Sequence, residues 1–295
     1  MTVSILLSLY KSTPYLERYF INLLKVEDID YYELSIVHND PTTEELEIID
    51  RYKNKLNIIY KSVKRESLYK SWNRAIKQSK GSFITMLNVD DIRHVNSIKN
   101  MSNFLKENKD INFCYGDFTV IDDINKTKGK MAKHKNFTKF YGIKESIGGP
   151  FFMFRRSIIN EIGLFDEQFK SGGDYEFVAR MALNYNGAKV KGNHGFFLNE
   201  KKGLSTNFSN NFDSIQELER TVIQLRYGLL AEIDLKYFRR ALNYDLNHIY
   251  NFDKKINYDF ISTSFSPIFS INRLLIKNLK YHIIFLLRKF KYLFK

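Results

Sequence analysis

The sequence predicts an α/β fold built on a doubly wound, mainly parallel sheet. Strand-like runs alternate with segments of helical periodicity through the first ninety residues, which is typical of successive β-α-β units. The strand candidates are residues 3–9, 33–38, 56–60 and 82–87. Hydrophobic residues make up 44% of the 295-residue chain, which provides a substantial core and excludes general disorder.

The helices expected between these strands follow from apolar residues at helical spacing. The first begins near Pro14, a residue suited to the first turn of a helix. The second begins near Glu44, and the third covers residues 67–79 and ends before Gly81. Farther on, the pattern predicts a helix at 94–106, a strand at 111–121, a Lys-rich loop at 122–140 and a strand at 151–154. Loops at 122–147 and 190–210 are expected to determine which ligands are bound.

Two adjacent carboxylates, Asp90 and Asp91, directly follow the strand candidate at 82–87. Ligands of open parallel sheets bind outside the carboxyl ends of the strands, so these residues lie where a site is expected. Two hard oxygen donors suit Mg²⁺ or Mn²⁺ carrying a phosphorylated ligand. A polar turn is the alternative. The polar pairs Tyr10-Lys11 and Asn39-Asp40 follow two other strands, and this convergence favours a site.

Charge and cysteine content restrict the classes of function. The net charge is +13, and residues 268–295 contribute seven basic and no acidic side chains to it. Apolar residues at helical spacing run through the same tail, which predicts an interfacial helix on anionic lipid; a packed helix with a basic solvated face is the alternative. The single cysteine, Cys114, excludes an internal disulfide and a cysteine-based metal cluster. No apolar window is long enough to predict a membrane-spanning helix.

Several motifs, in order along residues 1–207, resemble those of family 2 glycosyltransferases of the GT-A fold. Residues 69–76, 80–81 and 88–91 resemble the family's core signature, residues 149–150, 154–157, 163–166 and 173–180 its acceptor-side block, and residues 203–205 its closing motif. No GxGxxG or Walker A pattern is present, which disfavours dinucleotide or P-loop chemistry.

The resemblance implies transfer of a sugar from a nucleoside diphosphate donor to an acceptor hydroxyl, with inversion at the anomeric carbon. It implies that Asp91 binds Mn²⁺ or Mg²⁺ directly, and that Asp90 contacts the ribose and also the metal. It places the catalytic base at Asp174, because a carboxylate must take the proton of the attacking hydroxyl. A simple N-cap is the alternative role of Asp174. The other positions assigned to nucleotide-sugar binding are Ser8, Tyr10, Asn39, Asp40, Lys70, Asn73, Asn88 and Arg180; Arg180 could equally position Asp174.

Some positions depart from the family pattern. His38-Asn39 stand where an acidic pair is usual, with Asp40 one position later, and Asn88 replaces the first acidic residue of the metal motif. Gly173 precedes Asp174 where an acidic residue is common. A histidine ligand of some members has no clear match near residue 200, where Glu200 is a substitute or a surface carboxylate. We expect Trp72 to pack in the core, with acceptor stacking as the alternative.

The expected organisation is a GT-A domain at 1–212 and a helical extension at 213–295, with helices at 215–230 and 235–249. The expected partners are a nucleotide-sugar donor, with a UDP-sugar favoured, a glycan or lipid-linked acceptor, and an anionic membrane surface at 268–295. We expect a cytoplasmic protein, peripheral on the cytosolic face of a membrane if the tail binds lipid. The alternatives are a catalytically inactive sugar-nucleotide-binding protein, a nucleotidyltransferase, and a nucleic-acid-binding protein, which no recognised module supports.

Overall fold

The computed structural model describes residues 3–126, 128–199, 215–227, 229 and 241. The chain divides into two compact units. The described residues between 3 and 199 belong to the first unit, and helix α8 (Ile215–Arg226) belongs to the second. The start of α8 agrees with the helix expected from residue 215.

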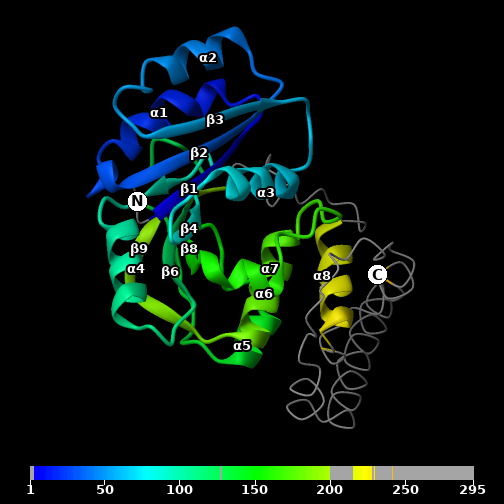
Figure 1. The fold of residues 1–295 in the computed structure, drawn as a ribbon. Coiled ribbons are helices and arrows are strands. Elements are labelled where there is room, and N and C mark those ends of the chain that lie inside the picture. The colour runs from blue at the N-terminus through cyan, green and yellow to red at the C-terminus, as the bar shows by residue number, and fades with distance from the viewer. Residues whose placement is uncertain (1–2, 127, 200–214, 228, 230–240, 242–295) are drawn as a thin grey trace, which may run out of the picture. The chain divides into compact units, whose positions relative to one another are not determined.

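One sheet runs through the first unit (Figure 1). Its strands are β1 (Val3–Leu9), β2 (Tyr32–Asn39), β3 (Ile58–Val63), β4 (Phe83–Met86), β5 (Ile92–Arg93), β6 (Phe113–Ile121), β7 (Lys130–Ala132), β8 (Phe152–Arg155) and β9 (Gly187–Leu198). The strand order is β3-β2-β1-β4-β8-β6-β9-β5, and β7 pairs with β6. Strands β1 to β4 pair in parallel, as do β6 and β9, whereas β8 is antiparallel to both β4 and β6. The predicted α/β class with a mainly parallel sheet is confirmed.

The helices of the first unit are α1 (Thr13–Leu23), α2 (Thr43–Asp50), α3 (Leu68–Gln78), α4 (Ser97–Glu107), α5 (Lys139–Lys144), α6 (Ile159–Ile162) and α7 (Gly173–Asn184), with short 3-10 turns at Ile29–Tyr31 and Arg156–Ile158. Local sequence sets several of their starts. Thr42 caps α2 in a reciprocal capping box with Glu45, and the Ser67 hydroxyl accepts from the Lys70 amide at the start of α3.

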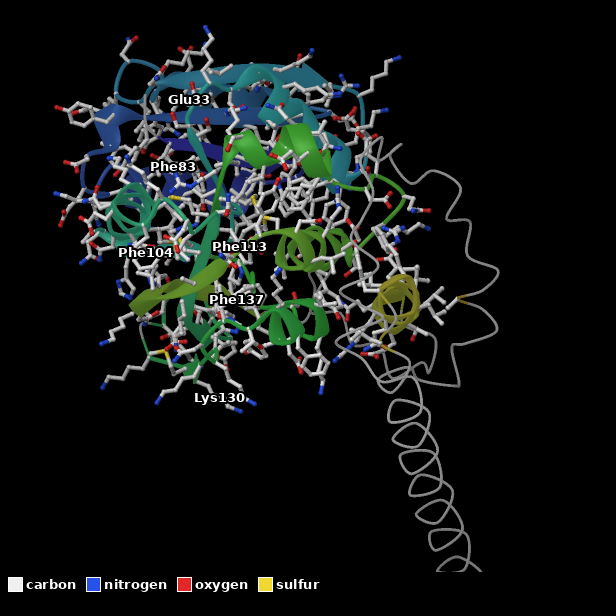
Figure 2. The ribbon with its side chains drawn as sticks, turned by 60° about the horizontal axis from the view of Figure 1, so that its bottom comes forward. Glu33, Phe83, Phe104, Phe113, Lys130 and Phe137 are labelled. Carbon is white, nitrogen blue, oxygen red and sulfur yellow. The ribbon has the colours of Figure 1, made fainter. Side chains whose placement is uncertain are left out.

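Helices cover both faces of the sheet. Alternate residues of β1 join apolar residues of α1, α2 and α4 in one buried cluster, so these helices share a face. Ser35 alternates with Leu34 and Ile36 of that cluster, and its hydroxyl donates to the carbonyl of Ala75 in α3 at 2.9 Å. Helix α3 therefore covers the opposite face. Figure 2 shows Phe113 in the interior, close to Phe137, and Lys130 at the rim; the centroids of the two phenylalanine rings lie 5.3 Å apart.

Some elements differ from the predictions. Strand β9 covers residues 187–198, although a loop was expected from residue 190, and β7 and the start of α5 fall within the predicted loop at 122–140. Strands β7 and β9 are stabilised by pairing with β6, which is a long-range interaction. The local sequence pattern of these two strands is therefore weak. Several predictions lie outside the described residues: the tail 268–295, the helix at 235–249 apart from residue 241, residues 203–205, Glu200 and the boundary at 212. In the part of the chain that the structure describes, no helix is long and apolar enough to cross a membrane.

Candidate functional site

The carboxyl ends of the parallel strands form one edge of the sheet. Parallel pairing places Leu9 beside His38, Leu6 beside Met86, and Asn39 beside Val63. The chain therefore leaves β1, β2, β3 and β4 at the same edge, where the predicted site residues were expected to converge.

Tyr10, Asp40 and Arg65 form a surface cluster at this edge. The Tyr10 side chain is 38% exposed, and the Arg65 guanidinium lies 3.6 Å from the centroid of its ring, a close cation–π stack. Asp40 has a positive φ of 44° and accepts a hydrogen bond from the Arg65 amide at 3.1 Å. The side chains of Tyr10 and Asp40 are both exposed to solvent. Arg65 was not predicted; its position just after β3 was the only signal in the sequence.

Asn39 lies beneath this cluster, with no exposed surface. Its side-chain amide nitrogen donates to the Leu9 carbonyl at 3.2 Å and to the Ser71 hydroxyl at 3.1 Å, and its oxygen accepts from the Glu66 amide at 2.9 Å. This fully buried, hydrogen-bonded side chain joins β1 and β2 to α3. It has no surface with which to contact a nucleotide-sugar. This differs from the predicted nucleotide contact. Half-buried Ser8 lies 3.5 Å from the same amide nitrogen.

The Asn88–Asp91 segment follows β4. Asp91 is only 2% exposed, and its carboxylate accepts from the Leu198 amide at 3.3 Å and from the Asn88 side chain at 3.1 Å. Asp90 is half-buried, and its main-chain carbonyl accepts from the Arg18 guanidinium at 2.8 Å. Burial and the neighbouring charge of Asp90 raise the pKa of Asp91 well above its usual value. Asp90 is the more accessible carboxylate of the pair.

The Asn88–Asp91 segment suits a divalent cation that is bound together with a phosphorylated ligand. The described residues contain no group of three or more His, Cys, Asp or Glu side chains that could hold a metal ion. Mg²⁺ and Mn²⁺ accept one or two protein carboxylates when substrate phosphates and water complete the coordination. The oxygen donors of Asp90 and Asp91 suit this mode of binding.

Asp174 lies in the first turn of α7 and is half-buried. Gly172 occupies the N-cap position, so the alternative of Asp174 as an N-cap is wrong. The Oδ1 atom of Asp174 accepts from the Tyr175 amide at 2.8 Å and from the Tyr69 hydroxyl at 3.4 Å. Tyr69 belongs to the first turn of α3, which begins five residues after β3 ends. This contact therefore places Asp174 at the carboxyl edge of the sheet.

Asn73 and Arg180 fasten the segment that precedes α7. Asn73, 1% exposed, exchanges two hydrogen bonds of 2.9 Å with the backbone of Phe165. The buried Arg180 guanidinium lies 2.7 Å from Glu176 and also donates to the carbonyls of Ile162 and Leu164. Neither side chain reaches the surface, which differs from the predicted contact with the donor. Arg180 retains the predicted alternative, the positioning of α7 and Asp174.

The remaining predicted positions divide between surface and core. Lys70 is exposed, and its ammonium lies 4.0 Å from the carboxylate of Glu66. Trp72 is 5% exposed and packs against Tyr69 and Phe165, so the predicted core role is confirmed.

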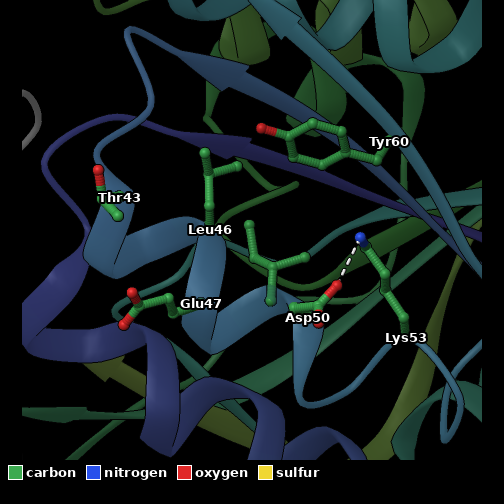
Figure 3. A pocket seen from close by; sticks show the side chains of 7 residues that line it. Thr43, Leu46, Glu47, Asp50, Lys53 and Tyr60 are labelled. Carbon is green, nitrogen blue, oxygen red and sulfur yellow. Dashed lines mark hydrogen bonds and ion pairs between the residues drawn. The ribbon is translucent and has the colours of Figure 1, made fainter.

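A separate hollow of about 450 Å³ lies between α2 and β3 (Figure 3). Leu46 and Tyr60 line it together with the ion pair of Asp50 and Lys53. None of the predicted site residues lines this hollow.

Comparison with known proteins identifies the family. The model of glycosyl transferase family 2 matches residues 4–163, which include β2 to β4, all of β1 but its first residue, and the Asp90–Asp91 pair. The chain belongs to glycosyl transferase family 2.

Relatives agree with this assignment. An uncharacterized glycosyltransferase of Methanocaldococcus jannaschii is 23% identical over 62% of this chain and 65% of its own length. The poly(ribitol-phosphate) β-N-acetylglucosaminyltransferase TarS of Staphylococcus aureus is 23% identical over 68% of this chain and 36% of its own length. The chain therefore spans less than two thirds of either relative.

Solved structures show the same fold. A TarS fragment in complex with UDP-GlcNAc superposes with a TM-score of 0.62 at 18% identity, covering 93% of this chain and 78% of the fragment. The mannosyltransferase PcManGT from Pyrobaculum calidifontis, in complex with GDP-Man and Mn²⁺, gives a TM-score of 0.54 at 12% identity, covering 93% and 73%. The fold of this family 2 chain is GT-A, as the sequence predicted.

Proposed function

We propose that this family 2 chain is a metal-dependent, inverting glycosyltransferase of the hexosyltransferase type, which uses a nucleotide-sugar donor. The observation that carries the proposal is the contact of 3.4 Å between Tyr69 and Asp174. It brings an acidic residue of the second half of the chain to the edge at which β1, β2 and β4 end. Donor-binding and proton-accepting groups can then act on one substrate.

The donor half of the proposed site uses the residues at the strand ends. Tyr10 and Asp40 offer an exposed ring and carboxylate to the nucleoside, with Ser8 beside them, and Lys70 offers an exposed cation to the phosphates. Asn88 contributes by holding the carboxylate of Asp91. We favour a UDP-sugar, because TarS, which shares this fold, is described in complex with UDP-GlcNAc.

Asp90 and Asp91 would hold Mn²⁺ or Mg²⁺ against the donor diphosphate. When bound, the cation supplies neutralisation of the charge that develops on the departing nucleoside diphosphate. The loop after β4 that carries both carboxylates is itself held in place, because Arg18 donates to the Asp90 carbonyl and the Leu198 amide donates to the Asp91 carboxylate. Asp90, the more accessible carboxylate, is proposed to be the residue that also reaches the ribose.

Asp174 is proposed as the general base. The acceptor hydroxyl oxygen forms a bond to the anomeric carbon while the bond from that carbon to the diphosphate oxygen breaks. The hydroxyl proton passes to the Asp174 carboxylate, and the nucleoside diphosphate leaves with the bonding electron pair. Attack on the face opposite the leaving group inverts the configuration of the anomeric carbon.

The acceptor is proposed to be a glycan or lipid-linked oligosaccharide of surface-glycan synthesis. We place the protein in the cytoplasm, with peripheral attachment to the cytosolic face of a membrane through residues 268–295. This placement rests on the basic, apolar composition of that tail. Loss of liposome co-sedimentation after deletion of 268–295 would support it, and unchanged co-sedimentation would contradict it.

The test of the proposed function is a panel of UDP-, GDP- and TDP-sugars with Mn²⁺, Mg²⁺ or EDTA, read by thermal shift and by release of nucleoside diphosphate. We expect metal-dependent release from one donor, which Asp174→Asn reduces about 10²- to 10⁴-fold while donor binding is retained. Binding without release by the wild type would instead identify a sugar-nucleotide-binding protein. Release of pyrophosphate would identify a nucleotidyltransferase.

A further inference from the structure

The glycine that precedes Asp174 packs directly on an aromatic ring. A Cβ atom built on Gly173 would lie 2.7 Å from the ring atoms of Tyr69, closer than a Cβ approaches such atoms in real structures. The absence of a side chain at this position therefore allows the Tyr69 ring to lie against the first turn of α7. A residue with a side chain could not occupy this position without displacing the ring.

The Tyr69 ring is held on its other sides as well. It is 1% exposed, stacks on Phe165 at a centroid distance of 6.0 Å, and makes a T-shaped contact with Trp72 at a centroid distance of 5.5 Å. Phe165 in turn stacks on Phe177 of α7 at 4.2 Å. A ring held by Trp72 of α3, by Phe165 of the loop before α7 and by the first turn of α7 gives its hydroxyl one defined position.

That hydroxyl reaches Asp174. It donates to the Oδ1 atom at 3.4 Å, and the Tyr175 amide donates to the same atom at 2.8 Å. The distance of 3.4 Å is long for such a bond, and catalytic hydrogen bonds are often long before the substrate binds and shorten in the complex. Two donors on one oxygen restrict rotation of the carboxylate plane.

We propose that Tyr69 is a positioning residue, which sets the orientation of the Asp174 carboxylate toward the acceptor hydroxyl. Gly173 makes this possible because it has no side chain where the Tyr69 ring lies. The proposal rests on the role of Asp174 as the general base in the proposed function. It explains why a glycine precedes Asp174 and why a buried tyrosine hydroxyl donates to the Asp174 carboxylate. The nucleotide-sugar and metal sites require neither feature.

The first experiment compares Tyr69→Phe with wild type in the full chain, using the active donor and measuring kcat, the donor dissociation constant and Tm. The variant keeps the ring and its packing and removes only the hydroxyl. We expect kcat to fall about tenfold, less than the full contribution of a general base, with donor affinity unchanged. The matched control is Tyr115→Phe, which removes a hydroxyl that donates from β6 to the Lys135 carbonyl at 2.8 Å; its kcat is expected to match wild type.

The second experiment is a double-mutant cycle with Gly173→Ala. The added methyl group must displace the Tyr69 ring, so kcat is expected to fall in Gly173→Ala and to fall no further in Gly173→Ala/Tyr69→Phe. Independent, multiplicative effects on kcat would overturn the proposal. So would a Tyr69→Phe enzyme with wild-type kcat.

A third comparison separates this proposal from the proposed function. If Asp174→Asn abolishes turnover while Tyr69→Phe does not change it, only the positioning role is wrong. If Asp174→Asn retains wild-type turnover, the general base itself is wrong, and the positioning role is overturned with it. In the Asp174→Asn background, Tyr69→Phe is expected to have no further effect on the residual rate.

Discussion

Asp91 and Asp174 are carboxylates of the two halves of the proposed site, and different interactions hold them. Asp91 is 2% exposed and is fixed by hydrogen bonds from Leu198, at the end of β9, and from the neighbouring Asn88. Asp174 is half-buried and lies beside the Tyr69 ring. The position of Asp91 therefore depends on sheet pairing, and that of Asp174 depends on aromatic packing between α3 and α7.

The difference extends to the residues behind each carboxylate. Behind Asp91, buried Arg93 donates to the Ser97 hydroxyl, and Ser97 in turn contacts the ring of His194. Behind Asp174, the buried pair of Arg180 and Glu176 ties α7 to the preceding loop. One region contains a buried histidine that can titrate in acid, whereas the other contains a buried ion pair. The two regions should therefore respond to different perturbations.

The largest effect on stability is expected behind Asp174. Arg180→Met leaves the Glu176 carboxylate buried without its ion-pair partner and should lower the free energy of unfolding by about 3–5 kcal/mol. Chemical denaturation measures this change. The control Arg180→Met/Glu176→Met removes both charges and should recover most of the loss. A double variant as unstable as the single one would show that packing, and not the unpaired charge, sets the stability of this region.

A smaller loss of stability is expected behind Asp91 when the pH is lowered. Burial, together with the charge of Arg93, lowers the pKa of His194 to about 4, below the value of about 6.5 in the unfolded chain. The unfolded state binds this proton more readily, so the stabilisation is complete above pH 6.5 and is lost as the pH falls toward 4. Between pH 7 and pH 5 the loss is about 2 kcal/mol.

His194→Gln is the variant that tests this pH dependence. It removes the titrating ring, so its free energy of unfolding should fall less between pH 7 and pH 5 than that of wild type, by about the same 2 kcal/mol. Denaturant titrations at both pH values measure the difference. Equal pH dependence in the two proteins would contradict the assignment of the acid sensitivity to this residue.

The last comparison is at the metal pair, where the variants of two adjacent carboxylates are expected to differ in stability. Asp91→Asn turns a side-chain N–H toward a donor, either Asn88 or the Leu198 amide, and should cost about 1–3 kcal/mol of unfolding free energy. Asp90→Asn, at the more accessible carboxylate, should leave Tm unchanged. Both variants should weaken metal-dependent donor binding, measured by calorimetry with Mn²⁺ and with EDTA. Unchanged donor affinity in both would exclude a metal site at this pair.

Local pattern was sufficient to predict much of this protein. The alternation of strands and helices gave the α/β class, and the position of Asp90 and Asp91 after a buried strand gave the edge of the sheet. These features depend on residues close together in the chain, where periodicity and turn chemistry carry the information.

Tertiary structure decided which polar residues face a ligand. Asn39, Asn73 and Arg180 have the right chemistry for a donor site, yet each is buried by partners far away in the sequence or by a neighbouring loop. Arg65 and Tyr69 follow β3 in the chain, but the contact of Arg65 with Tyr10 and that of Tyr69 with Asp174 are long-range and no local pattern records them. Whether a polar side chain binds a ligand or braces the fold depends on burial and on partners, and both are set only when distant segments pack together.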